Sequence, residues 1–231
     1  MYQSKFFINF ISTSLSKLFA SIGIILFNFV IVYFTNQETL GILMLNISLI
    51  AFLSIFSKFG LSHASLRLAS IYFNKKDKKT IIELIIYIIF ISGLISLVMS
   101  LIIFIFERFI AIEFYNNLRL EGVLKIFAIS LPFYTFIQIQ KSLFKSFKLP
   151  ALSNFSDIGS ILFICCLFVL FYKNINLEIT INQISLFFLF SCIIIFILNN
   201  FILFKSTKKN FKSEKIKKMI NIKKNLIKTL P

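Results

Sequence analysis

A stripe of polar side chains on the first long apolar segment is the part of this sequence best suited to bind a charged ligand. On a helical wheel of ~100° per residue, five polar residues fall within about 60° of one another; they are Ser14, Lys17, Ser21, Asn28 and Thr35. Polar groups that face acyl chains are costly, so the stripe as a whole favours a protein interior or an aqueous cavity. Lys17 taken alone fits equally well a lysine whose amine extends to the lipid headgroups.

Two further positions carry polar chemistry inside apolar segments. Gln138 shares a helical face with Thr135 and Ser142, which is typical of helix contacts and also makes Gln138 a candidate for lining a cavity. Asp157 is the acid nearest to a segment interior, so it is a candidate for ion or proton coupling. Because Asp157 lies close to the start of its segment, we favour a role in capping the helix N-terminus.

Metal and thiol chemistry are not indicated. Cys165, Cys166 and Cys192 lie in apolar runs without a CxxC pair, and His63 is the one histidine. We therefore expect neither a zinc site nor a disulfide, and no cofactor. No loop carries paired acids and His63 has no neighbouring carboxylate, so we do not expect an enzyme.

The composition identifies the class of protein that must position these residues. Hydrophobic residues make up 58% of the chain, charged residues 15%, and the mean hydropathy is +0.91, which is outside the range of soluble domains. The net charge of +16 lies in blocks between apolar runs. A nucleic-acid-binding surface would spread that charge over a folded domain, so we do not expect a nucleic-acid partner.

Six runs are long and apolar enough to cross the ~30 Å hydrocarbon core of a membrane. They cover residues 15–34, 40–56, 81–106, 122–140, 153–172 and 184–204. None shows the polar–apolar alternation of barrel strands. The sequence thus predicts an all-α, polytopic integral membrane protein with one six-helix bundle over residues 1–204. The half-polar link 57–80 begins with an amphipathic stretch that extends the second span or lies in the interface.

Basic residues predict the orientation. If the N-terminus is cytoplasmic, all but four of the 25 Lys and Arg residues lie on the inner side; the four are Arg108, Arg119, Lys125 and Lys173. Residues 205–231 alone hold ten lysines against Glu214. The positive-inside rule therefore places both termini in the cytoplasm, where the basic segment would contact anionic membrane lipids.

The first hairpin and the stretch that follows it resemble a known family. The segment YFTNQETLGILMLNISLIAFLSIFSKFGLSHASLRLAS has a short polar turn with an acid and a glycine, then a span, then Gly-Leu and an arginine. This pattern is similar to the opening of the polysaccharide biosynthesis, or Wzx-type oligosaccharide flippase, family of the MOP transporter superfamily. The matching positions are Glu38, Gly41, Gly60, Leu61 and Arg67. The chain departs at Lys58, where the family often has an acid.

Members of that family have twelve helices in two six-helix bundles that flank a central cavity. The resemblance implies that this chain is the N-terminal bundle, that 205–231 is a basic linker between bundles, and that a second six-helix half or a second copy completes the transporter. It also implies a bacterial inner-membrane flippase that moves an undecaprenyl-diphosphate-linked oligosaccharide to the outer leaflet. Lys17 and Arg67 could then contact the diphosphate, although Arg67 fits a headgroup anchor slightly better.

Other functions stay open at this point. Another MOP exporter, for drugs or for a peptidoglycan precursor, would share the same bundle. A truncated remnant that does not transport would also have six helices. A membrane enzyme of polysaccharide synthesis is the least favoured, because no loop carries paired acids and His63 has no neighbouring carboxylate.

Overall fold

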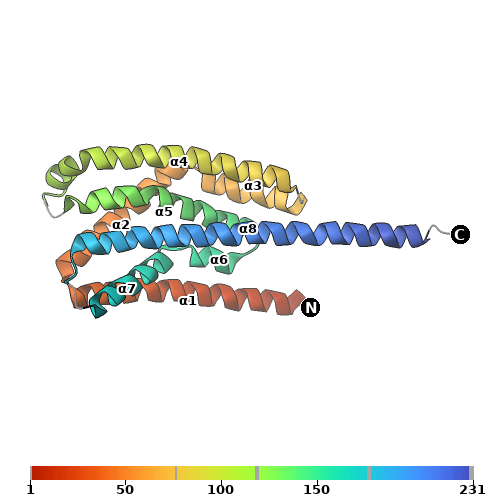
Figure 1. Ribbon diagram of the computed structural model, residues 1–231, viewed down its shortest axis with the longest axis horizontal. Helices are drawn as coiled ribbons and strands as arrows, with labels where there is room; N and C mark the ends of the chain where they lie inside the picture. The colour runs from red at the N-terminus through yellow and green to blue at the C-terminus, as the bar shows by residue number, and fades with distance from the viewer. Residues whose placement is uncertain (1, 76, 118–119, 176–177, 229–231) are drawn as a thin grey trace.

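The computed structural model describes residues 2–228 apart from 76, 118–119 and 176–177, and the described residues form helices and short connections with no strand among them. Figure 1 shows the helices side by side along one long axis, with both chain termini at the same end. The helices are α1 Tyr2–Phe34, α2 Gln37–Lys58, α3 Leu61–Lys75, α4 Lys78–Phe109 with a π-helical extension Ile110–Phe114, α5 Val123–Ser146, α6 Pro150–Phe155, α7 Ile158–Asn174 and α8 Ile181–Lys228.

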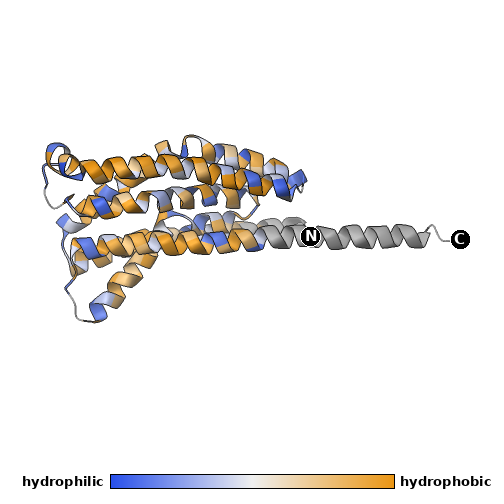
Figure 2. Cartoon of the chain, turned by 45° about the horizontal axis from the view of Figure 1, so that its top comes forward, coloured by the Kyte–Doolittle hydropathy of each residue, from blue (hydrophilic) through white to orange (hydrophobic). Residues whose placement is uncertain are grey.

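Five of these helices are long and apolar enough to cross a membrane, and α7 is a shorter apolar helix of 17 residues. At ~1.5 Å per residue α7 spans about 25 Å, a little less than the hydrocarbon core. Large apolar side chains stay exposed on the bundle, where a soluble protein would be polar. Figure 2 shows that apolar residues predominate along the helices. The prediction of an all-α polytopic membrane protein is confirmed.

The predicted fifth run, 153–172, is not one helix. It breaks at Ser156 and Asp157, which separate α6 from α7. The Ser156 hydroxyl donates to the Leu152 carbonyl at 3.0 Å, and the Asp157 carboxylate accepts from the Ile158 N–H at 3.0 Å. Short polar side chains compete in this way with the helical hydrogen bonds, so the polar pair ends one helix and starts the next.

The link after the second span forms a helix of its own, α3. The chain bends at Phe59 and Gly60, which both adopt the left-handed region with φ of 40° and 75°. A glycine takes this conformation without steric cost, which gives the Gly-Leu pair of the family pattern a structural role. Beyond the bend α3 lies against α4 and α5 and buries Ser65 and Ala69.

The C-terminal helix α8 is longer than the predicted span 184–204, because it continues without a break to Lys228. No glycine or proline interrupts residues 181–228, and lysine favours helix. Figure 1 shows α8 extending past the other helices at the end of the bundle that holds both termini. Of the predicted linker 205–231, residues 229–231 lie outside the described part of the chain, as does Arg119.

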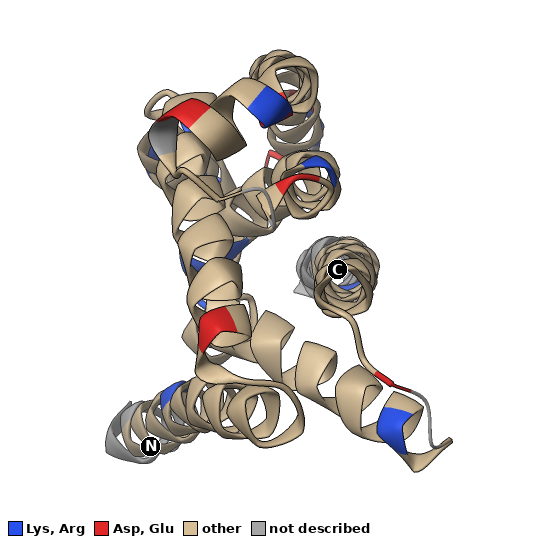
Figure 3. Ribbon diagram, turned by 90° about the vertical axis from the view of Figure 1, so that its left-hand side faces the viewer, with Lys and Arg blue, Asp and Glu red and all other residues tan. Residues whose placement is uncertain are grey.

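The central helix is α5, which contacts α2, α3, α4, α6 and α8 and buries most of its side chains. Seen from the end in Figure 3, α1 and α7 form the lower edge of the bundle and α4 the upper edge. The main core contains Phe127 and Leu131 of α5 with Phe27 of α1, Ile47 of α2 and Phe188 of α8. This arrangement places Ser130, Thr135 and Gln140 of α5 inside the bundle.

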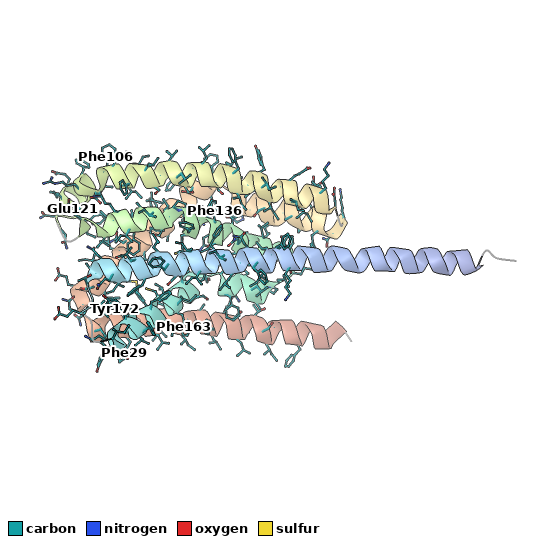
Figure 4. All side chains as sticks on the ribbon, in the orientation of Figure 1. Phe29, Phe106, Glu121, Phe136, Phe163 and Tyr172 are labelled. Atoms are coloured by element: carbon teal, nitrogen blue, oxygen red, sulfur yellow. The ribbon has the colours of Figure 1, made fainter. Side chains whose placement is uncertain are left out.

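The contact between α1 and α7 is unusually close. A Cβ atom built on Gly159 would overlap the Ala20 carbonyl, and one built on Gly23 would overlap the Gly159 carbonyl. The Phe19 and Phe163 rings pack beside this point at 4.7 Å, and Phe163 is labelled in Figure 4. Small residues allow such approach between membrane helices, where packing must replace the hydrophobic effect.

Proline 132 in the middle of α5 leaves one backbone carbonyl without its helical donor, the carbonyl of Ala128. Ser100 of α4 donates to that carbonyl at 2.6 Å. The hydroxyl of Ser100 on α4 thus takes the place of the missing helical donor for the Ala128 carbonyl on α5. An unpaired carbonyl would be costly at this depth in the membrane.

Replacing this serine should weaken the α4–α5 contact. We expect Ser100→Ala to destabilise the protein by about 1–2 kcal/mol, because it leaves the Ala128 carbonyl without a donor. Ser96→Ala is the matched control, since the buried Ser96 hydroxyl bonds to Gly93 of its own helix. Thermal unfolding of both purified variants measures the difference, and equal stability of the two would contradict the role of Ser100.

Candidate functional site

Asp157 and Lys141 form an ion pair at the break between α6 and α7. The Nζ atom of Lys141 lies 2.8 Å from Oδ2 of Asp157. The other carboxylate oxygen accepts the Ile158 N–H, so Asp157 caps α7 as its sequence position favours. The Lys141 side chain is only 21% exposed, which places a cation inside the bundle. The role of Asp157 in ion coupling stays a prediction.

A second cation lies near this pair. Lys58, at the C-terminal end of α2, is partly buried, and its charge is disfavoured first by that burial and second by repulsion from Lys141. We call Lys58, Lys141 and Asp157 the Lys141 cluster. It holds two positive charges against one negative charge, so it attracts a further anion.

Two polar side chains of α5 extend the Lys141 cluster along the helix. Tyr134, Gln138 and Lys141 share one face of α5 at spacings of four and three residues. The Gln138 side chain is half-buried, and Tyr134 is buried. Gln138 therefore lies in a polar environment, beside charged residues that sequence reasoning did not connect to it.

The polar stripe of α1 lies beside the face that packs in the bundle. Lys17 and Ser21 are exposed, and the Ser21 hydroxyl bonds to the Lys17 carbonyl of its own helix at 3.1 Å. Asn28 is half-buried, and its Oδ1 atom is buried without a hydrogen-bond partner. The packed face of α1 contains Ala20, Gly23 and Phe27 instead. Within this bundle Lys17 and Ser21 of the stripe are therefore free to face another molecule or a cavity, whereas Ser14, Asn28 and Thr35 are partly buried.

Arg67 is exposed on α3 and lies away from the other candidates. α3 packs on α4 and α5, whereas α1 packs on α6 and α7. Figure 1 shows α3 and α1 at opposite edges of the bundle. The structure thus does not bring Arg67 and Lys17 to one site in this bundle.

A further ion pair lies at the end of the bundle away from the termini. Glu107 of α4 is 4% exposed and its Oε1 atom lies 2.5 Å from Nζ of Lys125 on α5. The same ammonium lies 5.7 Å from the centre of the Phe104 ring. This pair ties α4 to α5 next to the distorted backbone at Phe106, which Figure 4 labels.

The cysteines lie in the core. Cys165, Cys166 and Cys192 are free and buried, and the Cys165 thiol points to the Ile184 carbonyl at 3.8 Å. Among the residues that the structure describes, no group of three or more His, Cys, Asp or Glu side chains is placed to hold a metal ion.

A comparison with protein-family models identifies the family. The model described as "Polysaccharide biosynthesis protein" matches residues 4–229, nearly the whole chain. The chain belongs to the polysaccharide biosynthesis protein family. Members of this family are generally flippases or transporters rather than enzymes. No curated protein and no solved structure matches the chain.

Membership in the polysaccharide biosynthesis family confirms the resemblance at the level of that family, and the Wzx type stays a prediction. Sequence reasoning missed Lys58 and Lys141 as site residues. The signal available for Lys141 was its spacing of three residues from Gln138, which places both on one helical face. Its partner Asp157 lies in another helix, and no periodicity links residues across a loop.

Proposed function

We propose that this chain forms one bundle of a flippase that moves an undecaprenyl-diphosphate-linked oligosaccharide from the inner to the outer leaflet of a bacterial inner membrane. Membership in the polysaccharide biosynthesis family supports a membrane transport role. The observation that carries the substrate class is the Lys141 cluster, which has excess positive charge inside an apolar bundle. A diphosphate needs charge-assisted contacts in such a low-dielectric site.

The ion pair suggests how binding is coupled to transport. Asp157 and a diphosphate compete for the ammonium of Lys141, because one cation cannot fully pair with both. Binding of a cation to Asp157 releases Lys141 for the substrate. Gln138 and Tyr134 offer hydrogen bonds farther along the same face of α5. No bond of the substrate is broken.

The remaining parts of the proposal concern orientation and partners. Both termini lie in the cytoplasm, and the lysines of α8 beyond residue 204 contact anionic lipids. A second six-helix bundle, from another chain or another copy, provides the opposite wall of the cavity. The exposed Lys17 and Ser21 of α1 and the half-buried Asn28 line that cavity.

Loss of the protein distinguishes a flippase from an enzyme. In cells that use this protein for glycan export, deletion of its gene should stop the export. The lipid-linked precursor should then accumulate in the inner leaflet. Loss of a synthetic enzyme would instead stop the precursor from forming. Extraction of lipid-linked glycans with leaflet-specific labelling measures both quantities, and an absent precursor would overturn the proposal.

The exposed cations should have smaller effects than the cluster. We expect Lys17→Ala to lower the export rate by roughly two- to fivefold, because exposed charge contacts contribute about 0.2–1 kcal/mol. Arg67→Ala tests the remaining candidate in the same assay. Normal export at wild-type expression would remove either residue from the substrate path.

A further inference from the structure

An apolar groove lies between α4 and α5 at the level of Pro132. It has a volume of about 340 Å³ and is lined by Leu97, Ser100, Ile129, Pro132, Phe133 and Phe136. The Phe133 and Phe136 rings also contact Phe196 of α8, with centroid distances of 6.0 and 5.5 Å. Figure 4 labels Phe136. The groove thus has walls from α4 and α5, and α8 lies next to it.

The polar groups of the groove are already used. Pro132 has no N–H, and the Ser100 hydroxyl donates to the Ala128 carbonyl. The other four lining side chains are hydrocarbon. A ligand here gains apolar contact and finds no free side-chain donor on the wall, so its chemistry must be that of a hydrocarbon chain.

The position of the groove along the helices indicates that it opens toward the lipid acyl chains. Leu97 and Ser100 lie well inside α4, and Ile129 to Phe136 lie in the middle part of α5. Leu97 is 55% exposed and Ile129 47% exposed, and the neighbouring Leu94 and Val98 are exposed as well. In a membrane-spanning helix these side chains face acyl chains.

The walls do not resemble a helix contact. The close contact between α1 and α7 is built from Ala20, Gly23 and Gly159, which is typical of packed membrane helices. The groove is walled by Leu, Ile and Phe, which hold a partner helix away. Its volume is more than twice the ~150 Å³ in which an apolar cavity binds benzene.

We propose that this groove binds one acyl chain of a membrane phospholipid. The chain of a lipid-linked substrate is not the occupant, because the groove residues of α5 and the face with Tyr134, Gln138 and Lys141 point to opposite sides of the helix. A bound acyl chain fills the space beside Pro132. The groove is thus a lipid site separate from the Lys141 cluster.

Photo-crosslinking of the unmodified chain tests the site. The purified protein is incorporated into vesicles of dioleoyl phosphatidylglycerol with a trace of the same lipid carrying a diazirine in one acyl chain. We expect the label to concentrate on peptides that contain residues 97–100 and 129–136. A label spread evenly over the exposed faces of α1, α4 and α8, or a label displaced by polyprenyl phosphate at equal concentration, would overturn the proposal.

A filled groove supplies the second measurement. Leu97→Trp places a large ring in the groove, whereas Ile105→Trp, on the 69% exposed Ile105 of the same helix, leaves the groove empty. Native mass spectrometry should show one phospholipid retained by the wild type and by Ile105→Trp, and at least tenfold less by Leu97→Trp. Equal retention by the two variants, or a protein dimer in place of the lipid adduct, would contradict the acyl-chain site.

Discussion

Gly159→Ala is expected to destabilise the protein by about 3 kcal/mol, at the upper end of the cost of overpacking a core. The added methyl would overlap the Ala20 carbonyl. This carbonyl is part of the backbone of α1, so it cannot rotate away as a side chain can. α1 and α7 must then separate, and the adjacent contact of Phe19 with Phe163 is lost with them. For a chain of this size the loss corresponds to a fall in melting temperature of about 6–12 °C.

Gly41→Ala is the matched control for this experiment. Gly41 also lies in a membrane helix, but a Cβ atom built there meets nothing within 4 Å. Alanine is the better helix former, so the control should be unchanged or up to about 1 kcal/mol more stable. Thermal unfolding of both variants in the same detergent measures the contrast. If Gly159→Ala unfolds like Gly41→Ala, then α1 and α7 do not pack as closely as described.

The second large effect is expected on transport. Lys141→Gln should lower glycan export by roughly 10- to 100-fold, because one charge-assisted contact to a phosphate is worth about 1.5–3 kcal/mol. The amide keeps a polar end on a side chain one bond shorter but cannot carry the charge. Export is followed by surface labelling of the glycan at matched protein expression. Lys145→Gln, one turn further along α5 and exposed, should export normally.

Asp157 variants separate the two roles of that residue. Asp157→Asn keeps a good N-cap for α7 but removes the charge that holds Lys141, whereas Asp157→Ala removes both. We expect Asp157→Asn to remain folded and to bind the lipid-linked precursor more tightly while exporting it more slowly. Asp157→Ala should lose a further ~1 kcal/mol of stability. Normal export by Asp157→Asn would show that the carboxylate only caps the helix.

The membrane class and the positions of the spans are readable from local sequence. Each of the runs 15–34, 40–56, 81–106 and 184–204 lies within one observed helix, because spanning a hydrocarbon core demands about 20 apolar residues whatever their neighbours are. The family is also readable, because the polar turn that contains Glu38 and the bend at Gly60 are marked by an acid and by glycines at the spacing of the family pattern.

The break at Asp157 was harder to predict, because Ser and Asp are compatible with the first turn of a helix as well as with the gap between two helices. By hydropathy, residues 153 to 172 form one apolar run. The helix nevertheless breaks there, because the side chains of Ser156 and Asp157 make hydrogen bonds that end one helix and begin the next. The end of the last span is a similar case. A charged stretch stops a membrane span but does not stop a helix, so α8 runs on to Lys228.

Which side chains meet is a matter of tertiary packing. Lys141 and Asp157 lie in different helices, and so do Ser100 and the carbonyl that Pro132 releases. The same holds for Gly159 and Ala20, whose chain separation is large. A helical period relates residues within one helix and carries no information about the rotation or neighbours of another. Residue type and spacing therefore decide that this chain crosses a membrane, and helix packing decides which of its charged side chains meet.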